Sequence, residues 1–318
     1  MSRVVCGLDL GGTKLLGVVV DPSSDAPMVV LKRPRPDHVV AGMASMVEEL
    51  KASAREVDPA AEVTAVGVGM PGLVDRAGVF RYGPNLKGVV DVGIAEAVAD
   101  AVGLPVVVDN DATCAGWAEH ERGAARGANH SLTVTLGTGI GAGLTVKGQV
   151  LRGAHGFAGE PGHMMIEPSG HLCRCGRLGC WEQYASGFAL GRMGREAAEQ
   201  GRAGALVALA GGDLAAIEGE HVTAAAADGD ADSLAVIGQF SWWVAQGLAN
   251  LVNVLDSEVV VIGGGLAEVG ELIIDPIRRA FDGVIMGADH RDEVPIVAAQ
   301  LGERAGAWGA ALLASART

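Results

Sequence analysis

The sequence is poor in aromatic residues and in positive charge. Phenylalanine, tryptophan and tyrosine make up 4% of the 318 residues, and 24 lysines and arginines are outnumbered by 38 aspartates and glutamates, giving a formal net charge of −14. A nucleic-acid-binding surface usually requires a concentrated basic face, so this balance argues against a nucleic-acid partner. An enzyme that acts on small molecules fits the composition better.

Long uninterrupted apolar runs are also missing. The candidate runs are short or broken by polar residues such as Gln246, Asn250 and Asn253, whereas a membrane-spanning helix needs about 20 consecutive apolar residues. The opening segment MSRVVCGLDLGGTK has no apolar stretch ending in a small-residue cleavage site, so it does not resemble a signal peptide. We therefore expect a cytoplasmic protein with no membrane partner.

Cysteine is scarce and unevenly placed. Of the five cysteines, Cys6 and Cys114 stand alone, whereas Cys173, Cys175 and Cys180 fall within eight residues. An odd total does not suit the disulfide framework of a small secreted domain. Three thiolates and a histidine form a closed tetrahedral ligand set for structural Zn²⁺. A disulfide between two of the three, or plain buried cysteines, are the alternatives.

The fourth zinc ligand would be one of two nearby histidines. His163 lies before the cysteine cluster, and His171 lies within its immediate flank. Gly176 and Gly179 allow the backbone to turn sharply enough to bring Cys180 back to the ion. We therefore predict a structural zinc site in this segment.

Strand-like and helix-like segments alternate after an opening hairpin, and this alternation predicts an α/β layered domain. A long apolar helix at 233–255 and a terminal helix at 301–314 are expected further along the chain. The other elements expected in the first part of the chain are strands at 3–9, 15–21, 28–33, 63–70 and 105–109 and helices at 38–57, 91–102 and 112–122.

The opening pattern is repeated. A second strand pair, 131–136 and 140–146, flanks Gly137-Thr138-Gly139 as the first pair flanks residues 11–14. Singly, each would be an ordinary glycine-containing turn. Together they indicate a weak internal duplication, with two α/β halves facing one another across a cleft that would bind a ligand.

The two glycine-rich turns are suited to bind phosphate oxygens. Backbone N–H groups and threonine hydroxyls form an anion-binding nest, and Asp9, just before the first turn, would hold Mg²⁺ through water. The chain has no Gly-x-x-x-x-Gly-Lys-Ser/Thr stretch, so the turns do not form a Walker P-loop. The residues predicted to bind the phosphates and their metal are Asp9, Gly11, Gly12, Thr13, Lys14, Thr138 and Gly139.

A third glycine cluster follows an expected strand at 258–262 and precedes an expected helix at 269–281. A dinucleotide-binding fold also places glycines after a strand. Here, however, Glu268 breaks the GxGxxG phase, and no acidic residue closes a following strand. We expect Gly264 and Gly265 to let the base and ribose of a nucleotide approach the backbone closely.

Six motifs resemble those of the ROK family, named for repressors, open reading frames and kinases. The motifs are DLGGTK at 9–14, GMPGLVD at 69–75, NDA at 110–112, TLGTGIGAG at 135–143, GEPGH at 159–163 and CRCGRLGCWE at 173–182. The resemblance implies the two-lobed, duplicated ribonuclease H-like fold of actin, sugar kinases and Hsp70, with a central cleft. The smaller lobe would comprise 1–110 and about 302–318, and the larger lobe 111–301 with the zinc motif.

The resemblance also implies residue roles. Asp111 matches the family's catalytic base, which would accept the proton of the attacking sugar hydroxyl. A helix N-cap is its simpler role, and both could coexist. The resemblance favours His163 over His171 as zinc ligand. The residues implied to bind the sugar are Gly72, Asn85, Asn110, Asp111, Glu160, His163 and Glu182.

The activity implied is phosphorylation of glucose at its 6-hydroxyl by ATP, with catalytic Mg²⁺ and structural Zn²⁺. Fructose, mannose or N-acetylmannosamine as acceptor and polyphosphate as donor stay open. A sugar-responsive repressor would need a DNA-binding segment before the core, which starts here at Arg3. A homodimer or homotetramer is also expected; Trp242 and Trp243 would pack in the core or, alternatively, between subunits.

Overall fold

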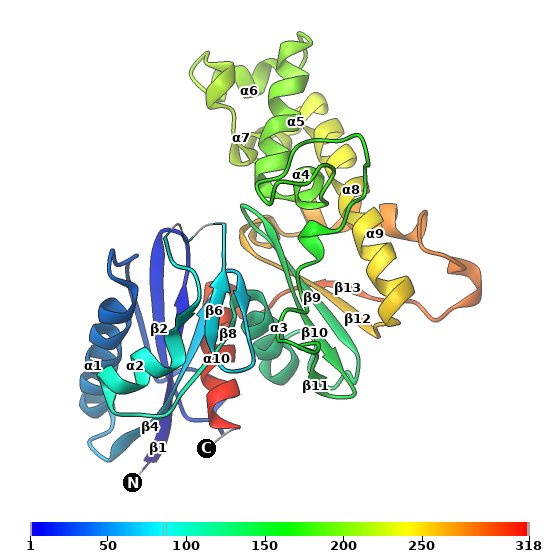
Figure 1. Cartoon of the computed structure of the whole chain (residues 1–318). Helices are drawn as coiled ribbons and strands as arrows, with labels where there is room; N and C mark the ends of the chain where they lie inside the picture. Colours follow the sequence, from blue (N-terminus) through cyan, green and yellow to red (C-terminus); the bar gives the residue numbers. More distant parts are fainter. Residues whose placement is uncertain (1, 85, 87, 317–318) are drawn as a thin grey trace. The chain divides into compact units, whose positions relative to one another are not determined.

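The computed structural model describes residues 2–84, 86 and 88–316. Its contacts divide the chain into two compact units (Figure 1). Unit 1 comprises Met1–Thr133, Ala142–Gly159 and Gln300–Thr318, and unit 2 comprises Val134–Gly141 and Glu160–Ala299. Each unit is therefore assembled from segments that lie far apart in the sequence.

Unit 1 is built on a five-stranded sheet with the strand order β3-β2-β1-β4-β8. β2 is antiparallel to both β1 and β3, which confirms the expected hairpin and third strand, and β4 lies parallel to β1 and β8. Strands buried on both faces read as continuous apolar runs, as β1 and β4 do. The strands are β1 (Ser2–Leu10), β2 (Lys14–Val20), β3 (Val29–Pro34), β4 (Ala61–Met70) and β8 (Val106–Asn110).

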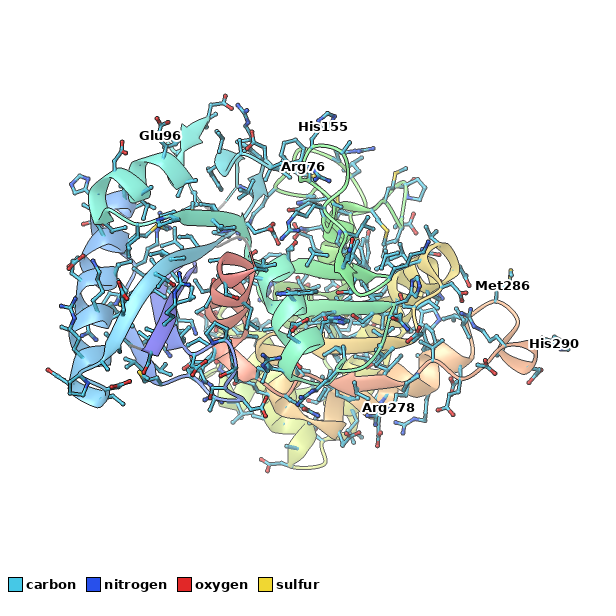
Figure 2. All side chains as sticks on the ribbon, turned by 90° about the horizontal axis from the view of Figure 1, so that it is seen from below. Arg76, Glu96, His155, Arg278, Met286 and His290 are labelled. Carbon is cyan, nitrogen blue, oxygen red and sulfur yellow. The ribbon has the colours of Figure 1, made fainter. Side chains whose placement is uncertain are left out.

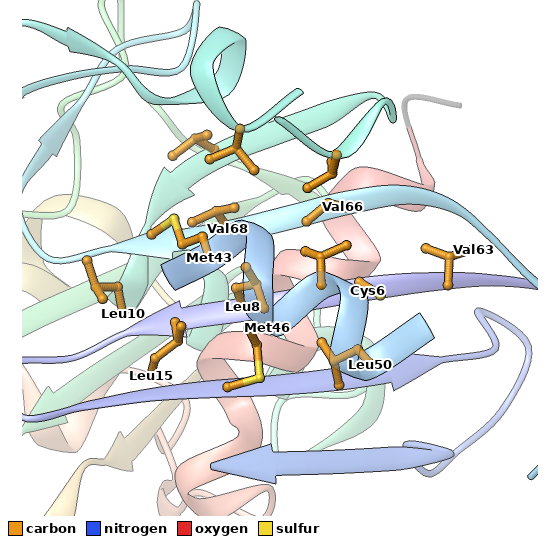
Figure 3. Packing of buried hydrophobic residues seen from close by; sticks show 14 of the residues in the cluster. Cys6, Leu8, Leu10, Leu15, Met43, Met46, Leu50, Val63, Val66 and Val68 are labelled. Atoms are coloured by element: carbon orange, nitrogen blue, oxygen red, sulfur yellow. The ribbon is translucent and has the colours of Figure 1, made fainter. Parts of the chain in front are cut away.

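Helices cover both faces of this sheet, because alternate residues of β1 point to opposite sides. Cys6 and Leu8 pack in one cluster with Met43 of α1 (Figure 3). Val5 packs in another cluster with Trp308 of α10. The helices of unit 1 are α1 (Val39–Val57), α2 (Ile94–Val102), α3 (Asp111–Arg122) and α10 (Ala305–Ser315).

Helix α10 lies directly on the backbone of the sheet, because β1 and β4 carry glycine where it crosses them. A Cβ at Gly7 would lie 1.9 Å from the carbonyl oxygen of Ala307, and one at Gly67 would lie 1.9 Å from that of Ala310. Any side chain at either position would force the helix off the sheet. The last helix of the chain thus packs on the strand that begins it.

The predicted lobe boundary after residue 110 differs from the division into units. Helices α3 and α10 pack closely, and both belong to unit 1. A Cβ at Gly309 of α10 would lie 1.7 Å from the carbonyl oxygen of Cys114 on α3. The predicted lobes, 1–110 with 302–318 and 111–301, stay a prediction that these contacts do not test.

A second five-stranded sheet repeats the order of the first. Its order is β11-β10-β9-β12-β13, so that β9, β10 and β11 take the places of β1, β2 and β3. This repeat agrees with the duplication inferred from the two glycine-rich turns. The strands are β9 (Ser131–Leu136), β10 (Ile140–Val146), β11 (Gln149–Val150), β12 (Val259–Gly263) and β13 (Ile296–Ala298), and a small sheet in unit 1 contains β5 (Leu73–Val74), β6 (Val79–Tyr82) and β7 (Val92–Gly93).

The long helix α8 organises the helices of unit 2. The fully buried Trp181 packs over Gly247 of α8 and donates to the carbonyl oxygen of Trp243 (2.8 Å). Trp242 is 44% exposed, so core packing is wrong for this residue. The helices are α4 (Glu182–Ala185), α5 (Gly187–Glu199), α6 (Gly204–Leu209), α7 (Gly219–Ala227), α8 (Ala231–Leu255) and α9 (Glu271–Asp282).

Three helices begin later than their apolar patterns suggest. The terminal helix α10, expected from residue 301, starts at Ala305 after a 3₁₀ turn. Helix α2 starts at Ile94, because Val92 and Gly93 pair with β6, and α9 starts at Glu271 after a 3₁₀ turn. Within the described part of the chain, no helix is long and apolar enough to cross a membrane. The 3₁₀ turns are η1 (Pro161–His163), η2 (Leu214–Ala216), η3 (Gly265–Val269), η4 (Ala288–His290) and η5 (Gly302–Arg304).

Candidate active site and metal centre

The carboxyl end of β8 leads directly into α3 through Asn110 and Asp111. Asn110 has an extended backbone (φ −65°, ψ 143°), and its Oδ1 accepts a hydrogen bond from the Thr113 N–H (3.0 Å). Its Nδ2 donates to the carbonyl oxygen of Gly72 (3.2 Å). Asn110 is therefore the N-cap of α3, and the N-cap role considered for Asp111 is wrong, because Asp111 is already helical.

Asp111 holds its carboxylate at the positive end of the α3 dipole. Its Oδ1 accepts a hydrogen bond from the Ala112 N–H (2.8 Å). Burial raises the pKa of Asp111 to about 6, although backbone N–H groups at Ala112 and Asp111 oppose the shift. A carboxylate with a pKa near neutrality is well matched to accept a proton from a reacting group.

Asp9, near the end of β1, is a second carboxylate with a raised pKa. Burial raises its pKa to about 7, the negative charge of Asp111 adds to the shift, and Lys14 opposes it. A Cβ at Gly306, in the first turn of α10, would lie 2.6 Å from Asp9 Oδ2. Burial thus disfavours the negative charge of the Asp9 carboxylate. A hard divalent cation such as Mg²⁺ prefers oxygen ligands, so this carboxylate fits such a cation.

The first glycine-rich turn leaves Gly12 and Thr13 exposed. The Gly11 N–H donates to the Lys14 carbonyl oxygen (2.8 Å), which closes the turn between β1 and β2. The Lys14 ammonium, in contrast, donates to Glu303 Oε2 (2.7 Å). Lys14 is thus engaged by a carboxylate in this structure rather than directed at the turn.

The second turn is closed in the same way. The Gly137 N–H donates to the Gly139 carbonyl oxygen (3.0 Å), and Thr138 is exposed. A Cβ at Gly139 would lie 2.9 Å from Glu182 Oε2. The Glu182 carboxylate therefore lies directly beside this turn, a proximity that the sequence did not reveal.

Gly264 and Gly265 lie after β12, as expected, but they lead into η3 rather than directly into a helix. Gly264 has φ +81°, and a Cβ there would lie 2.5 Å from the carbonyl oxygen of Leu136. Only glycine combines that backbone angle with so close an approach. Gly265 has open space around it, which would admit a ligand.

His163, Cys173, Cys175 and Cys180 converge on one point, with one ligand atom from each lying within 4.8 Å of the others. Cys175 Sγ and Cys180 Sγ are 3.6 Å apart, and Cys173 Sγ lies 3.7 Å from His163 Nδ1. Tetrahedral zinc with Zn–S bonds of about 2.3 Å places its ligands about 3.8 Å apart. The residues therefore fit a closed four-ligand zinc site.

The same geometry separates the two candidate histidines. The ring of His171 packs against Tyr184 with 5.3 Å between centroids, and the His171 N–H donates to the Tyr184 hydroxyl (3.0 Å). His171 thus belongs to an aromatic contact, whereas His163 lies in the ligand cluster. Each of the five cysteines is a free thiol, which excludes the disulfide alternative in this structure.

The structure brings several of the proposed sugar-binding residues next to the metal cluster. Glu160 is the N-cap residue of η1, whose last residue is His163. Glu182 starts α4, and its Oε1 lies 3.1 Å from Cys173 Sγ. Asn85 lies outside the described residues.

One pair of functional candidates was missed from the sequence. Asp109 and Arg152 form a buried ion pair beside Asn110. Asp109 directly precedes the NDA motif, and this position could have indicated that it lies near the site. Nothing in the sequence around Asp109 indicates that Arg152 is its ion-pair partner. The pair becomes visible only when the fold brings the two segments together.

Comparisons with known proteins place this arrangement in a family. The model of the ROK family matches residues 5–317. The chain belongs to the ROK family. A glucokinase of Streptomyces coelicolor is 38% identical over 313 residues, which cover 97% of this chain and 96% of that protein. A glucokinase of Thermotoga maritima is 33% identical, covering 98% of this chain and 97% of the relative.

A solved ROK structure agrees with the observed fold. The crystal structure of a ROK family glucokinase from Streptomyces griseus, in complex with glucose and AMPPNP, matches with a TM-score of 0.86 and 37% sequence identity. The match covers 98% of this chain and 99% of that one. The ROK sugar kinase fold inferred from the motifs is therefore confirmed for this chain.

Proposed function

We propose that this protein is an ATP-dependent glucokinase, which transfers the γ-phosphoryl group of ATP to the 6-hydroxyl of glucose. The observation that carries the proposal is Asp111, a carboxylate at the N-terminus of α3 with its pKa raised to about 6. It lies in the ROK motif of a chain 33–38% identical to named glucokinases over nearly its whole length.

Asp111 would accept the proton of the 6-hydroxyl as that oxygen attacks the γ-phosphorus. Phosphoryl transfer needs the acceptor held in line and little covalent help from the protein. Asn110 can assist, because its amide uses one N–H for Gly72 and one lone pair for Thr113. A second N–H and a second lone pair remain for a sugar hydroxyl.

Glu160, His163 and Glu182 are proposed to bind the other sugar hydroxyls. Carboxylates and imidazole at set positions distinguish the stereochemistry of hydroxyl groups better than apolar walls can. Gly72 and Asn85 complete the proposed set. The zinc ligands would hold this segment in shape, since a closed four-ligand site leaves no position for substrate. Binding of zinc would thus contribute local folding free energy rather than chemistry.

The two glycine-rich turns are proposed to bind the nucleotide phosphates through the backbone N–H groups and hydroxyls of residues 11–13, Thr138 and Gly139. Asp9 would hold Mg²⁺, which supplies neutralisation of charge on the phosphoryl oxygens. Lys14 would have to leave Glu303 to reach a phosphate. Gly264 and Gly265 would admit the base and ribose.

The test is a coupled assay of ADP release over a hexose panel of glucose, fructose, mannose and N-acetylmannosamine. We expect glucose to give the highest kcat/KM with MgATP. Polyphosphate in place of ATP tests the donor. A higher kcat/KM for another hexose would replace glucose as the substrate, and no turnover with any sugar would contradict the kinase proposal.

Location and assembly follow from the same proposal. An enzyme that consumes ATP at the entry of glucose metabolism would work in the cytoplasm, where ATP and reduced thiols are available. A homodimer or homotetramer is also proposed. It is supported by exposed apolar side chains such as Trp242 on α8 and Phe188 on α5, which are 44% and 49% exposed.

A further inference from the structure

A buried ion pair lies at the carboxyl end of β8. Arg152 Nε donates to Asp109 Oδ2 (2.5 Å), and the side chains of Arg152 and Asp109 are 18% and 7% exposed. The other carboxylate oxygen of Asp109, Oδ1, accepts from the Asn110 N–H (2.9 Å). Asp109 thus joins Arg152 to the backbone of the residue that caps α3 and precedes Asp111.

Arg152 begins the segment 152–159, the last part of unit 1 before Glu160. The Ala158 N–H donates to the Arg152 carbonyl oxygen (3.2 Å), so the segment folds back on itself. At its end, a Cβ on Gly159 would lie 3.6 Å from Thr113 Oγ1 in the first turn of α3. The segment therefore meets the region of β8 and α3 at both of its ends.

The middle of the segment is held by the loop after β5. Arg76 Nη2 and Nε donate to the Gly153 carbonyl oxygen (2.5 and 3.2 Å). The Arg76 N–H donates to the His155 carbonyl oxygen (3.3 Å), and Figure 2 shows these two residues side by side. Among the described residues, the Arg76 side chain bonds the Gly153 carbonyl oxygen, whereas Arg152 joins the segment to β8 through Asp109.

We propose that Arg152 is a positioning residue for the glucokinase reaction: its buried ion pair with Asp109 holds the segment that leads to Glu160 against the β8–α3 junction that carries Asn110 and Asp111. The inference rests on the proposed function. Arg152 touches neither substrate nor nucleotide in this role. It joins two stretches of backbone, and residues next to each of them, Glu160 and Asn110, are proposed to bind glucose.

The Cys114 thiol of α3 shows which charged groups lie near the ion pair. Asp9, Asp109 and Arg152 face the same region, because all of them act on the Cys114 thiol of α3. Burial raises the pKa of Cys114, the carboxylates of Asp109, Asp9 and Asp111 raise it further, and Arg152 lowers it. Arg152 is thus the cation that balances Asp109 beside the proposed base.

Lys14 is the other charged group in this region, because its positive charge lowers the pKa of Asp9. Its ammonium donates to Glu303, and it is unchanged in the variants below. Neither Asp109 nor Arg152 is among the groups that shift the pKa of Asp111, which burial raises and the backbone N–H groups of Ala112 and Asp111 lower. Removal of either partner of the ion pair should therefore disturb the position of the segment without moving the pKa of Asp111.

The experiment measures steady-state kinetics and pH profiles of Arg152→Met, Asp109→Asn and the double variant with MgATP and glucose. For Arg152→Met we expect KM for glucose to rise about tenfold or more, since small misplacements are costly, with KM for ATP nearly unchanged. The acid limb of kcat/KM should stay near pH 6 in Arg152→Met and in Asp109→Asn, because burial and backbone hydrogen bonds set the pKa of Asp111. The double variant should raise KM for glucose no more than Arg152→Met does, since the two residues act through one contact.

Arg152→Lys is the matched control, which separates the effect of the positive charge from that of the hydrogen-bond geometry. It keeps the positive charge but not the Nε–H donor, so KM for glucose should rise while the acid limb stays in place. It also keeps the test open if Arg152→Met does not fold, as judged by thermal unfolding.

Unchanged KM for glucose in the folded Arg152 variants would overturn the proposal. So would an equal rise of KM for ATP and for glucose, which a general loss of structure would produce. Wild-type protein that phosphorylates no hexose would instead contradict the glucokinase function itself, so the two failures are distinguishable.

Discussion

Asp111 depends for its proposed chemistry on its surroundings as much as on its identity. Burial raises its pKa to about 6, and a general base must be ionised to act. The acid limb of kcat/KM, which reports the free enzyme, should therefore fall with decreasing pH around pH 6. Above that value the contribution of Asp111 should be constant, because its carboxylate is already ionised.

Asp111→Asn is the control for this profile. It should reduce kcat by about 10²–10⁴-fold, the usual contribution of a general base, while calorimetry shows little change in glucose affinity. Near-normal turnover in this variant, or an acid limb that persists in its residual activity, would remove Asp111 from the role of base.

Asp9, which is proposed to hold Mg²⁺, shows the stability cost of a buried carboxylate. Its folded pKa of about 7 lies above its ordinary value of 3.8, so the folded state binds more protons between about pH 4 and pH 7. Stability from this group is fully present below about pH 4 and is lost as pH rises through 7.

Asp9→Asn should consequently stabilise the metal-free protein, by on the order of 2 kcal/mol at pH 8 and by little at pH 4. Urea unfolding in EDTA at both pH values measures the difference. Equal effects at the two pH values would show that Asp9 is not held in the surroundings described here.

The sequence was informative about the identities of such residues and less so about their local roles. The motif NDA singled out Asp111 as a site candidate, which stays a prediction, but the N-cap was assigned to the wrong residue. A cap is decided by backbone angles, and the extended conformation of Asn110 follows from where β8 ends. That end is set by pairing with β4, which no window around residue 110 contains.

At the scale of elements, the packing of α10 on the first sheet rests on glycines. Gly67→Val should destabilise the protein by about 3 kcal/mol or more, because its Cβ position lies 1.9 Å from the Ala310 carbonyl oxygen. Urea unfolding measures the change. Gly238→Ala is the matched control, since a Cβ within α8 meets nothing within 4 Å there and should stabilise by roughly 0.5–1 kcal/mol.

The segment with the proposed zinc ligands is the element that we propose to hold the sugar-binding residues in place. Cys173→Ala, Cys175→Ala and Cys180→Ala should each lose zinc, measured by metal analysis, because a tetrahedral site needs all its ligands. Each should also weaken glucose binding by tenfold or more, since the proposed sugar ligand Glu182 lies beside Cys173. Disturbing the contacts between metal ligands and their neighbours typically changes affinity or activity by about that factor.

His171→Ala is the control for the cysteine variants, and it should keep zinc, because His171 contacts Tyr184 rather than the cluster. A zinc-free cysteine variant with normal glucose affinity would show that the metal centre and the sugar site are independent. Loss of zinc in His171→Ala would instead reopen the choice of the fourth ligand.

At the scale of the whole molecule, the two sheets share one strand order. The sequence indicated this only through the similarity of two short turns. The strands that extend each sheet, β4 with β8 and β12 with β13, come from distant parts of the chain, so their order depended on long-range pairing. The terminal helix likewise reaches its partners only when the chain returns to unit 1 at Gln300.

Assembly belongs to this scale as well. If Trp242 lies between subunits, Trp242→Lys should lower the oligomer mass measured by light scattering, because a charge would be buried against the partner. Val254→Lys is the control on the same helix, at a position 82% exposed, and it should leave the mass unchanged. A wild-type monomer would contradict the proposed assembly.

The sequence by itself determined the family, the alternation of strands and helices, the cysteine cluster and the carboxylate of Asp111, because motif spacing and apolar periodicity are local properties of the chain. Tertiary structure alone decided which residue caps α3, that Glu182 lies against Gly139, and that Arg152 meets Asp109 across 43 residues of sequence. These contacts arise from the packing of distant segments, and their strength depends on burial that only the folded chain creates.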